Sequence, residues 1–396
     1  MTTTPTETPK ATGSRWLADR AKPFAGGALQ TAPTRKILPL SQGTPDLPTP
    51  RHAIEAVEEY LRNGRVYYTF HDGIPELREA IAVKLKRDND LDYDPATEII
   101  VTAGVQEAIF TTLMGVLNPG DELIVADPHY FVYDEIVGMI GAKVVAVPTD
   151  RERGFLLRPE AIEAAITPRT KAILIITPDN PTGAIQPRAV LEQVAEIATR
   201  HDLLVIADEL YERFCFDGAE HFSIGSLPGM HERTITLNGF SKAYAMTGWR
   251  VGYLCAPAGM KPALTTIKHA TSICAAAPSQ VAALAVLTGP QEPLDEMMTE
   301  WTERRAYLYD RLAAASIPVQ RTPGTYYVFV DIRPTGMTDA EFSRRLAEEE
   351  DVRVGPGGAY GPTGAGHVRC SFMLPIADLG EALDRFERFY GKYASA

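Results

Sequence analysis

Cysteine is scarce in this chain, and the few that occur are scattered. The 396 residues include four cysteines, Cys215, Cys255, Cys274 and Cys370. Their spacing suggests neither a zinc site nor a redox pair, and nothing in it demands an oxidising compartment. We therefore expect all four to be small apolar core residues, and we expect no metal site.

Long hydrophobic runs and an excess of positive charge are also missing. No apolar run approaches the roughly 18 residues of a membrane span, and the first ten residues lack the apolar centre of a signal peptide and predict a disordered tail. The formal net charge is -12, whereas a nucleic-acid-binding surface needs a basic excess. The basic doublets Arg304-Arg305 and Arg344-Arg345 fall in helix-like stretches, where we expect solvated faces. These features predict a cytoplasmic protein that binds neither nucleic acid nor membranes.

What the sequence does contain is an alternation of apolar strands and amphipathic helices. Strands are predicted at 98–102, 122–126, 143–148, 171–177, 203–208, 234–237 and 251–255, with helices at 105–117, 130–140, 159–166 and 189–199. The run 171–177 has no polar alternation, which is typical of a parallel strand covered on both faces. The alternation predicts an open, mostly parallel α/β sheet.

The character of the chain changes after Pro290. A long charged helix is predicted at 294–315, followed by strands at 319–331, 352–354 and 367–372 that belong to a smaller α+β unit. Thr338 with Glu341 predicts a capping box at the start of one of its helices. We predict an N-terminal tail and arm over 1–44 that joins the small domain, a large domain over 45–290 and a small C-terminal domain over 291–396.

Polar residues gather where such a sheet binds its ligands. Gly104, Asn180, Asp208 and Lys242 each end or closely follow an apolar strand. Ligands of open α/β sheets lie at the carboxyl ends of the strands. We therefore expect these four residues to share one site.

The stretch Asn238-Gly-Phe-Ser-Lys242-Ala-Tyr-Ala-Met-Thr-Gly-Trp-Arg250 is the most informative part of the chain. It follows a predicted strand and places one lysine in a polar turn, with Ser241 beside it and an arginine eight residues further on. A lysine that forms a Schiff base beside a phosphate-bearing cofactor needs this arrangement. The amine must be held and partly desolvated, while an arginine fixes the phosphate.

A second segment is suited to an anion. Residues 102–108 run from a strand end into a helix, so the amides of Val105 and Gln106, after Gly104, point at an anion with the helix dipole assisting. The G-x-x-x-x-G-K spacing of a P-loop is absent, and so is a strand-linked G-x-G-x-x-G. An anion turn without a nucleotide motif leaves room for a small phosphorylated cofactor.

The Lys242 stretch resembles the pyridoxal-phosphate lysine motif of the class I and II aminotransferases, the aspartate-aminotransferase-like enzymes of fold type I. The resemblance runs from about residue 40 to 392, with the motifs in the family's order. It implies a three-layer α/β/α large domain with a mostly parallel, mixed seven-stranded sheet, and a smaller α+β domain. It also implies pyridoxal 5'-phosphate bound to Lys242, with Lys242, Asp208 and Tyr211 as catalytic residues.

The same resemblance assigns the cofactor contacts. It implies that Asp208 pairs with the pyridine nitrogen, and that Tyr211 and Asn180, from the Asn-Pro-Thr-Gly turn, bind the phenolate oxygen. Tyr130 stands where the family places a ring that stacks on the cofactor. Gly239 stands where many members have a Ser or Thr hydroxyl on the phosphate. The phosphate contacts are then left to Gly104, Val105, Gln106, Ser241 and Arg250.

Substrate contacts and a partner follow from the resemblance too. Arg369, on a predicted strand, holds the α-carboxylate of the substrate, with the backbone of Gly43 and the side chain of Asn180 beside it. Tyr68 lies in a segment that crosses a dimer interface and reaches the phosphate of the neighbouring subunit. The resemblance therefore implies a homodimer with shared active sites.

The activity implied is transamination, in which an L-amino acid gives its amino group to a 2-oxo acid. A C–S lyase, or a cyclase that forms a cyclopropane, remains an alternative, because the same carbanion leads to each outcome. A non-catalytic regulator on this fold needs a DNA-binding domain, and the roughly 40 residues before the first motif are too short to supply one. No basic residue adjoins Val105-Gln106, which favours a neutral aromatic or aliphatic donor over aspartate, although Arg65 could overturn this.

Overall fold

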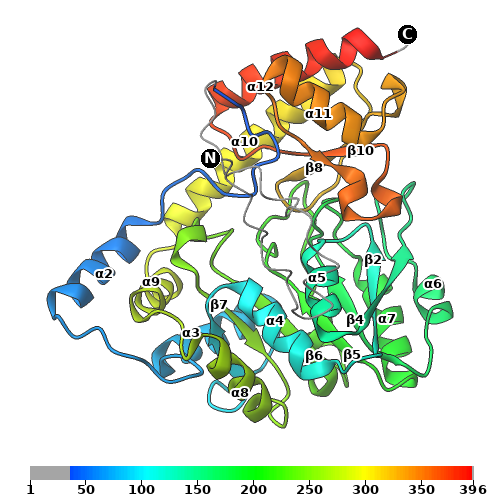
Figure 1. The fold of residues 1–396 in the computed structure, drawn as a ribbon. Coiled ribbons are helices and arrows are strands. Elements are labelled where there is room, and N and C mark those ends of the chain that lie inside the picture. Colours follow the sequence, from blue (N-terminus) through cyan, green and yellow to red (C-terminus); the bar gives the residue numbers. More distant parts are fainter. Residues whose placement is uncertain (1–35, 395–396) are drawn as a thin grey trace, which may run out of the picture. The chain divides into compact units, whose positions relative to one another are not determined.

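The structure is a computed structural model, and it describes residues 36–394 (Figure 1). The described residues from Ile37 onward belong to one compact unit. The predicted division at 45–290 and 291–396 stays a prediction. Residues 1–35, which make up most of the predicted tail and arm, lie outside the described part of the chain.

A seven-stranded sheet forms the centre of the larger part of the molecule. Its strands are β1 (Ile99–Thr102), β2 (Glu122–Asp127), β3 (Lys143–Pro148), β4 (Thr170–Ile176), β5 (Leu204–Asp208), β6 (Thr234–Gly239) and β7 (Gly252–Cys255). They lie in the order β1-β7-β6-β5-β4-β2-β3, and only β7 runs antiparallel to its neighbours. The predicted mixed, mostly parallel sheet is therefore confirmed, with strand positions within a few residues.

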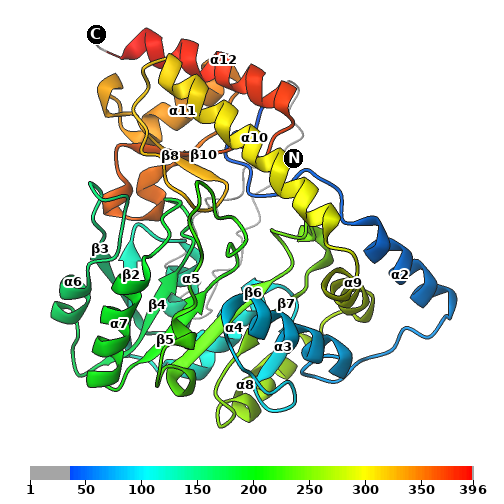
Figure 2. The same ribbon diagram turned by 180° about the vertical axis from the view of Figure 1, so that it is seen from behind.

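Helices cover both faces of this sheet, as Figures 1 and 2 show. The helices that follow the strands are α4 (Val105–Val116), α5 (Val132–Ile140), α6 (Pro159–Ala164), α7 (Arg188–Arg200) and α8 (Lys261–Ser272). Successive side chains of β4 enter opposite layers: Leu174 packs in the cluster of α4 and α5, whereas Ile173 and Ile175 pack in that of α6 and α7. A strand buried on both faces must be apolar at every position, which is why 171–177 lacks polar alternation.

A three-stranded antiparallel sheet forms a second centre. It consists of β8 (Tyr327–Asp331), β9 (Gly355–Pro356) and β10 (His367–Ser371), in the order β8-β10-β9, with α10 (Glu292–Ala314), α11 (Asp339–Glu350) and α12 (Ile376–Tyr393) around it. The capping box is confirmed on its first half, because Thr338 Oγ1 accepts from the amide of Glu341 at 3.2 Å.

Two predicted strands of this smaller sheet differ from the structure. The strand expected at 319–331 begins only at Tyr327, because Thr325 has a φ of 56° and interrupts the extended chain. Val319 keeps a single bridge to Val330. The strand expected at 352–354 is displaced to β9, and Val352 instead bridges Leu38 of the N-terminal segment.

The remaining helices are α2 (Arg51–Arg62), α3 (Pro75–Asn89) and α9 (Ala277–Thr288). No helix among residues 36–394 is long and apolar enough to cross a membrane.

Two expectations from composition need correction. Arg304 and Arg305 are not a solvated face: both are buried on α10, and their partners are Asp46 and Asp217 at 2.7 Å. Of the cysteines, Cys255 and Cys370 are buried as expected, whereas Cys215 and Cys274 are half-exposed. The helical pattern of α10 could not reveal partners that lie far away in sequence.

Candidate functional site

Lys242 lies in the turn that follows β6, and its amine is turned inward. Nζ donates to the carbonyl oxygen of Gly43 at 2.7 Å, a contact between segments 199 residues apart in sequence. Burial lowers the pKa of this amine below its usual value, and the guanidinium groups of Arg369 and Arg250 act in the same direction. A half-buried amine with a lowered pKa is more often neutral than an exposed one, and the neutral form acts as a nucleophile or base.

Asp208 ends β5, the strand next to β6, and is buried. Its carboxylate accepts from the hydroxyl of Tyr133 at 2.7 Å and from the amide of Leu210 at 3.2 Å. Burial raises the pKa of Asp208 to about 6, although Tyr133 and Leu210 stabilise the anion. No helix begins here, so the carboxylate is not a helix cap. It is a buried acid held by neutral donors.

Tyr133 was not predicted as a site residue. It lies on α5, one turn beyond Tyr130, and the two rings meet edge to face with centroids 5.8 Å apart. Because residues three apart on a helix share a face, the assignment of Tyr130 could have pointed to Tyr133 as well. Tyr130 itself is half-buried in front of the helix, and burial raises its pKa to about 12.

The predicted anion turn and Arg250 meet at the start of α4. Gly104 has a φ of 81°, and a Cβ built on it would lie 2.5 Å from Nη2 of Arg250. The guanidinium therefore rests directly on the backbone that precedes the amides of Val105 and Gln106. Two conditions of a phosphate site, a helix N-terminus and an arginine, are brought together here.

The glycine at 239 has a packing reason. A Cβ on Gly239 would lie 2.8 Å from Cγ2 of Val105 and 2.9 Å from Cα of Gly252, the latter a backbone atom that cannot easily give way. Ser241, two residues later, is buried in the same turn. The contact between β6, β7 and α4 therefore requires a glycine at position 239.

Arg369, on β10, faces the end of the large sheet. Nη1 donates to Oδ1 of Asn180 at 2.8 Å and Nη2 to the carbonyl of Ser41 at 3.2 Å, while Nε is buried without a partner. The guanidinium also lies over the ring of Tyr327, with Cζ 3.9 Å from its centroid. Tyr360 covers it at 5.0 Å. Its two hydrogen bonds go to neutral oxygens, and no carboxylate is paired with it in the described part of the chain.

The residue before Asn180 takes no part in this contact. Oδ2 of Asp179 accepts from the hydroxyl of Thr182 at 2.5 Å and from its amide at 3.1 Å. Burial raises the pKa of Asp179 to about 6. This carboxylate therefore shapes the turn that presents Asn180.

Three tyrosines meet around Gly43. The hydroxyl of Tyr326 donates to the same Gly43 oxygen at 2.8 Å, and the hydroxyl of Tyr327 would lie 2.6 Å from a Cβ at Gly43. The ring of Tyr211 packs edge-on against both, at 5.5 and 6.0 Å. Burial opposes ionisation of Tyr327, but its positively charged neighbours, Arg369 and Lys242, lower its pKa overall. Tyr326 and Tyr327 were not predicted, because a Tyr-Tyr pair at a strand start is ordinary core packing.

Tyr68 lies apart from this cluster within its own chain. It is 79% exposed, and its neighbours Tyr67 and Phe70 are 72% and 64% exposed. A contact of Tyr68 with the site would have to come from another copy of the chain.

Residues 35–386 match the family model described as aminotransferase class I and II. The chain belongs to this family. It is 40% identical over 354 residues to aromatic-amino-acid aminotransferase 2 of Thermococcus litoralis, which covers 89% of this chain and 91% of the relative. It is 39% identical over 356 residues to an aspartate aminotransferase of Pyrococcus abyssi, which covers 89% and 92%.

A solved structure agrees. The aromatic aminotransferase from Pyrococcus horikoshii matches this aminotransferase with a TM-score of 0.87 at 39% identity, over 90% of this chain and 96% of that one. The protein is thus a pyridoxal-phosphate-dependent transaminase of the aspartate-aminotransferase-like fold. Nothing in these relatives favours the lyase or cyclase alternative.

Proposed function

We propose that this aminotransferase holds its cofactor and its amino-acid substrate through the residues gathered around Lys242. The phosphate falls to Gly104, Val105, Gln106, Ser241 and Arg250, the ring to Tyr130, Asp208, Asn180 and Tyr211, and the substrate carboxylate to Arg369, Asn180 and Gly43. The observation that carries the proposal is that a half-buried amine of lowered pKa and a guanidinium with no carboxylate partner among residues 36–394 meet on one segment, through Gly43 and Ser41.

The residues fit pyridoxal phosphate on physical grounds. Any Cβ at position 104 would collide with the guanidinium of Arg250. Because Gly104 has none, the backbone amides that follow it stay open to a phosphate. At the other end, Asp208 is a buried acid that would be stabilised by the proton of a pyridine nitrogen. Asp208 ends β5, whereas Gly104 follows β1 and Arg250 precedes β7, so the two ends come from different strands of one sheet.

The reaction assigns a task to each group of the chain. When bound, the cofactor supplies an electron sink for the pair released at the substrate's α-carbon. Nζ of Lys242 would take up the proton from that carbon and give it up again later in the reaction, which a neutral amine can do. Arg369 holds the α-carboxylate in a two-pronged contact and so fixes which bond at the α-carbon faces Lys242.

A neutral donor, aromatic or aliphatic, is the substrate class that we propose. Arg369 lies against the rings of Tyr327 and Tyr360. Aromatic surfaces favour apolar side chains over a second carboxylate, whose burial would need another cation. The names of the relatives, aromatic and aspartate aminotransferase, span both cases, so a panel of donors must decide.

We further propose a homodimer in the cytoplasm. Six apolar side chains of α2 and the segment after it are exposed: Ile54, Leu61, Val66, Tyr67, Tyr68 and Phe70. Exposed apolar surface of this extent is typical of an interface. A second copy that covers it would bring Tyr68 to its neighbour's phosphate site.

The decisive test is Lys242→Ala. We expect the variant to lose the visible absorbance of the covalently attached cofactor and nearly all amino transfer, because no other amine in the site has the same position. Transfer from a panel of L-amino acids to 2-oxoglutarate or pyruvate is measured, with ammonia release as the readout for lyase chemistry. Full activity in the Ala variant would refute the assignment of Lys242.

A further inference from the structure

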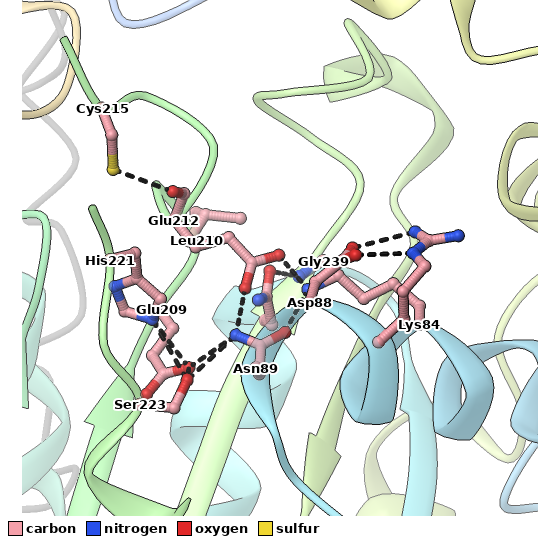
Figure 3. A network of polar contacts seen from close by, with 12 residues as sticks. Lys84, Asp88, Asn89, Glu209, Leu210, Glu212, Cys215, His221, Ser223 and Gly239 are labelled. Carbon is pink, nitrogen blue, oxygen red and sulfur yellow. Dashed lines mark hydrogen bonds and ion pairs between the residues drawn. The ribbon is translucent and has the colours of Figure 1, made fainter. Parts of the chain in front are cut away.

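The turn after β5 has two faces. Asp208 and Tyr211 point to the site, where they contact Tyr133 and the Tyr326–Tyr327 pair. Glu209 and Glu212, each one residue later, instead contact Ser223 and Asn89 (Figure 3). The turn is closed by the amide of Glu212, which donates to the carbonyl of Glu209 at 3.0 Å. Within residues 208–212, each of the two site residues is therefore followed directly by a glutamate.

Glu209 and Glu212 belong to a buried polar network. Glu209 is fully buried, and its Oε2 accepts from the hydroxyl of Ser223 at 2.6 Å and lies 3.1 Å from Nε2 of His221. The amide of Asn89 donates to Ser223 at 2.9 Å and to Glu212 at 2.7 Å. Figure 3 shows these side chains converging from α3, from the turn after β5 and from the 221–223 segment.

Only one of the two acids has a full countercharge. Lys84 forms an ion pair with Glu212 and donates to Asn89 at 2.7 Å. Glu209 has the imidazole of His221 and the hydroxyl of Ser223, and its Oε1 is buried without a partner. Glu209, Glu212 and His221 are close enough to ligate a metal ion, within 4.8 Å. The ammonium of Lys84 supplies a cation on the Glu212 side of the cluster, so we assign no metal ion to it.

Glu209 is coupled to Asp208 through both backbone and charge. Its amide donates to the carbonyl of Leu237 at 2.9 Å, which extends the pairing of β5 with β6 past Asp208. Its charge adds to burial in raising the pKa of Asp208. The negative charge of Glu209 makes the neighbouring Asp208 a stronger acceptor of a proton. Carboxylates that bond to a metal ligand from outside raise the basicity of that ligand in the same way.

We propose that Glu209 is a positioning residue for Asp208, and that the network of Lys84, Asn89, Glu212, His221 and Ser223 holds it there. It fixes the backbone that presents Asp208 and strengthens Asp208 as the acceptor for the proton of the cofactor's ring nitrogen. The inference rests on the proposed role of Asp208. It concerns affinity for the cofactor, and turnover only as a consequence.

The test is a double-mutant cycle on cofactor affinity. Full-length protein is stripped of cofactor and titrated with pyridoxal phosphate, for the wild type, Asp208→Asn, Glu209→Gln and the double variant. We expect Glu209→Gln to weaken binding by about 10- to 100-fold, the range for outer partners of a ligand. In the Asp208→Asn background the same change should have an effect of about twofold or less, because the residue through which Glu209 acts is gone.

Two outcomes would overturn the proposal. One is an unchanged dissociation constant for Glu209→Gln, and the other is an equal loss in both backgrounds, which would mark an independent structural role. If Asp208→Asn itself leaves affinity unchanged, the proposed role of Asp208 fails instead, and the two failures are thereby distinguished.

A matched control separates positioning from folding. Glu122 is also a buried glutamate, paired with Arg169 at 2.6 Å, but at the first residue of β2, the opposite end of the strand from the site. Glu122→Gln should lower the thermal unfolding midpoint and leave cofactor affinity within about twofold. Should Glu209→Gln fail to fold, Ser223→Ala removes the hydroxyl that donates to Glu209 and is put through the same cycle. A loss in both backgrounds alike would again overturn the proposal.

Discussion

Two arginines of this aminotransferase, the buried Arg305 and the half-buried Arg369, have different kinds of partner. Arg305, on α10, donates to both oxygens of Asp217, at 3.1 and 2.7 Å, and to the carbonyl of Thr322 at 2.8 Å. Arg369 donates only to Asn180 and Ser41, both neutral, and no carboxylate is paired with it among residues 36–394. The charge of Arg305 is compensated within the fold, whereas we propose that the charge of Arg369 is compensated by the carboxylate of the substrate. On this proposal, an incompletely paired charge below the surface is a guide to where a ligand of opposite charge binds.

The largest effect is expected at Arg369, whose proposed partner of opposite charge is the substrate. Arg369→Gln should lower kcat/KM by roughly 10²- to 10³-fold, because a buried charge pair with the substrate carboxylate is lost. Most of the loss should appear in KM for the amino donor. Steady-state kinetics with a good donor measures this, and cofactor absorbance checks that the site remains assembled.

The matched change at the compensated arginine should act on folding. Arg305→Met should lower the free energy of unfolding by about 3 kcal/mol, with kcat/KM per folded molecule nearly unchanged. Urea unfolding measures the first quantity. The comparison would break if Arg305→Met impaired kcat/KM as much as Arg369→Gln does.

Asp208, the acid of the site, is also incompletely compensated, and its effect on stability should depend on pH. The pKa of Asp208 is about 6 in the folded protein, above its ordinary value, so the folded state binds the proton more tightly. Its contribution to stability is complete below about pH 4 and is lost as the pH rises through 6. Asp208→Asn should therefore stabilise the cofactor-free protein by roughly 2 kcal/mol at pH 8 and by almost nothing at pH 4.

Urea unfolding at the two pH values checks this result. A gain of equal size at both would mean that packing, and not the charge of Asp208, causes it.

The smallest effect concerns a hydroxyl. Tyr327→Phe removes the group that lies against Gly43, and should lower kcat/KM by about fivefold, close to the 1 kcal/mol of one hydrogen bond. Tyr309→Phe is the matched change near Arg305. The hydroxyl of Tyr309 accepts from the amide of Thr322 at 3.4 Å. It should change stability only. Equal kinetics for the two variants would remove Tyr327 from the site.

The sequence predicted what local pattern and strand ends determine. Seven apolar runs defined the sheet, and the residues at their carboxyl ends proved to be neighbours: Asp208 and the Lys242 turn follow adjacent strands, and Arg250 rests on Gly104. The topology itself places such residues together, so no knowledge of side-chain packing was needed.

Features set by distant contacts were missed. Arg304 and Arg305 look like surface charges until Asp46 and Asp217, respectively 258 and 88 residues away, are folded against them. Tyr326 and Tyr327 join the site only because the N-terminal segment brings Gly43 to them. Long-range partners of this kind leave no periodic trace in one sequence.

The carbonyl of Gly43 belongs to the main chain, so no point mutation can delete it. Lys242 and Tyr326 both donate to this carbonyl oxygen. Substitutions can only change its position, and they do so through the residues that hold this segment. The strand-like hydrogen bonds that tie Leu38 and Ser41 to residues 351–353 fix its position. Substitutions in residues 351–353 should therefore alter the position of this carbonyl, and with it the position of the Lys242 amine.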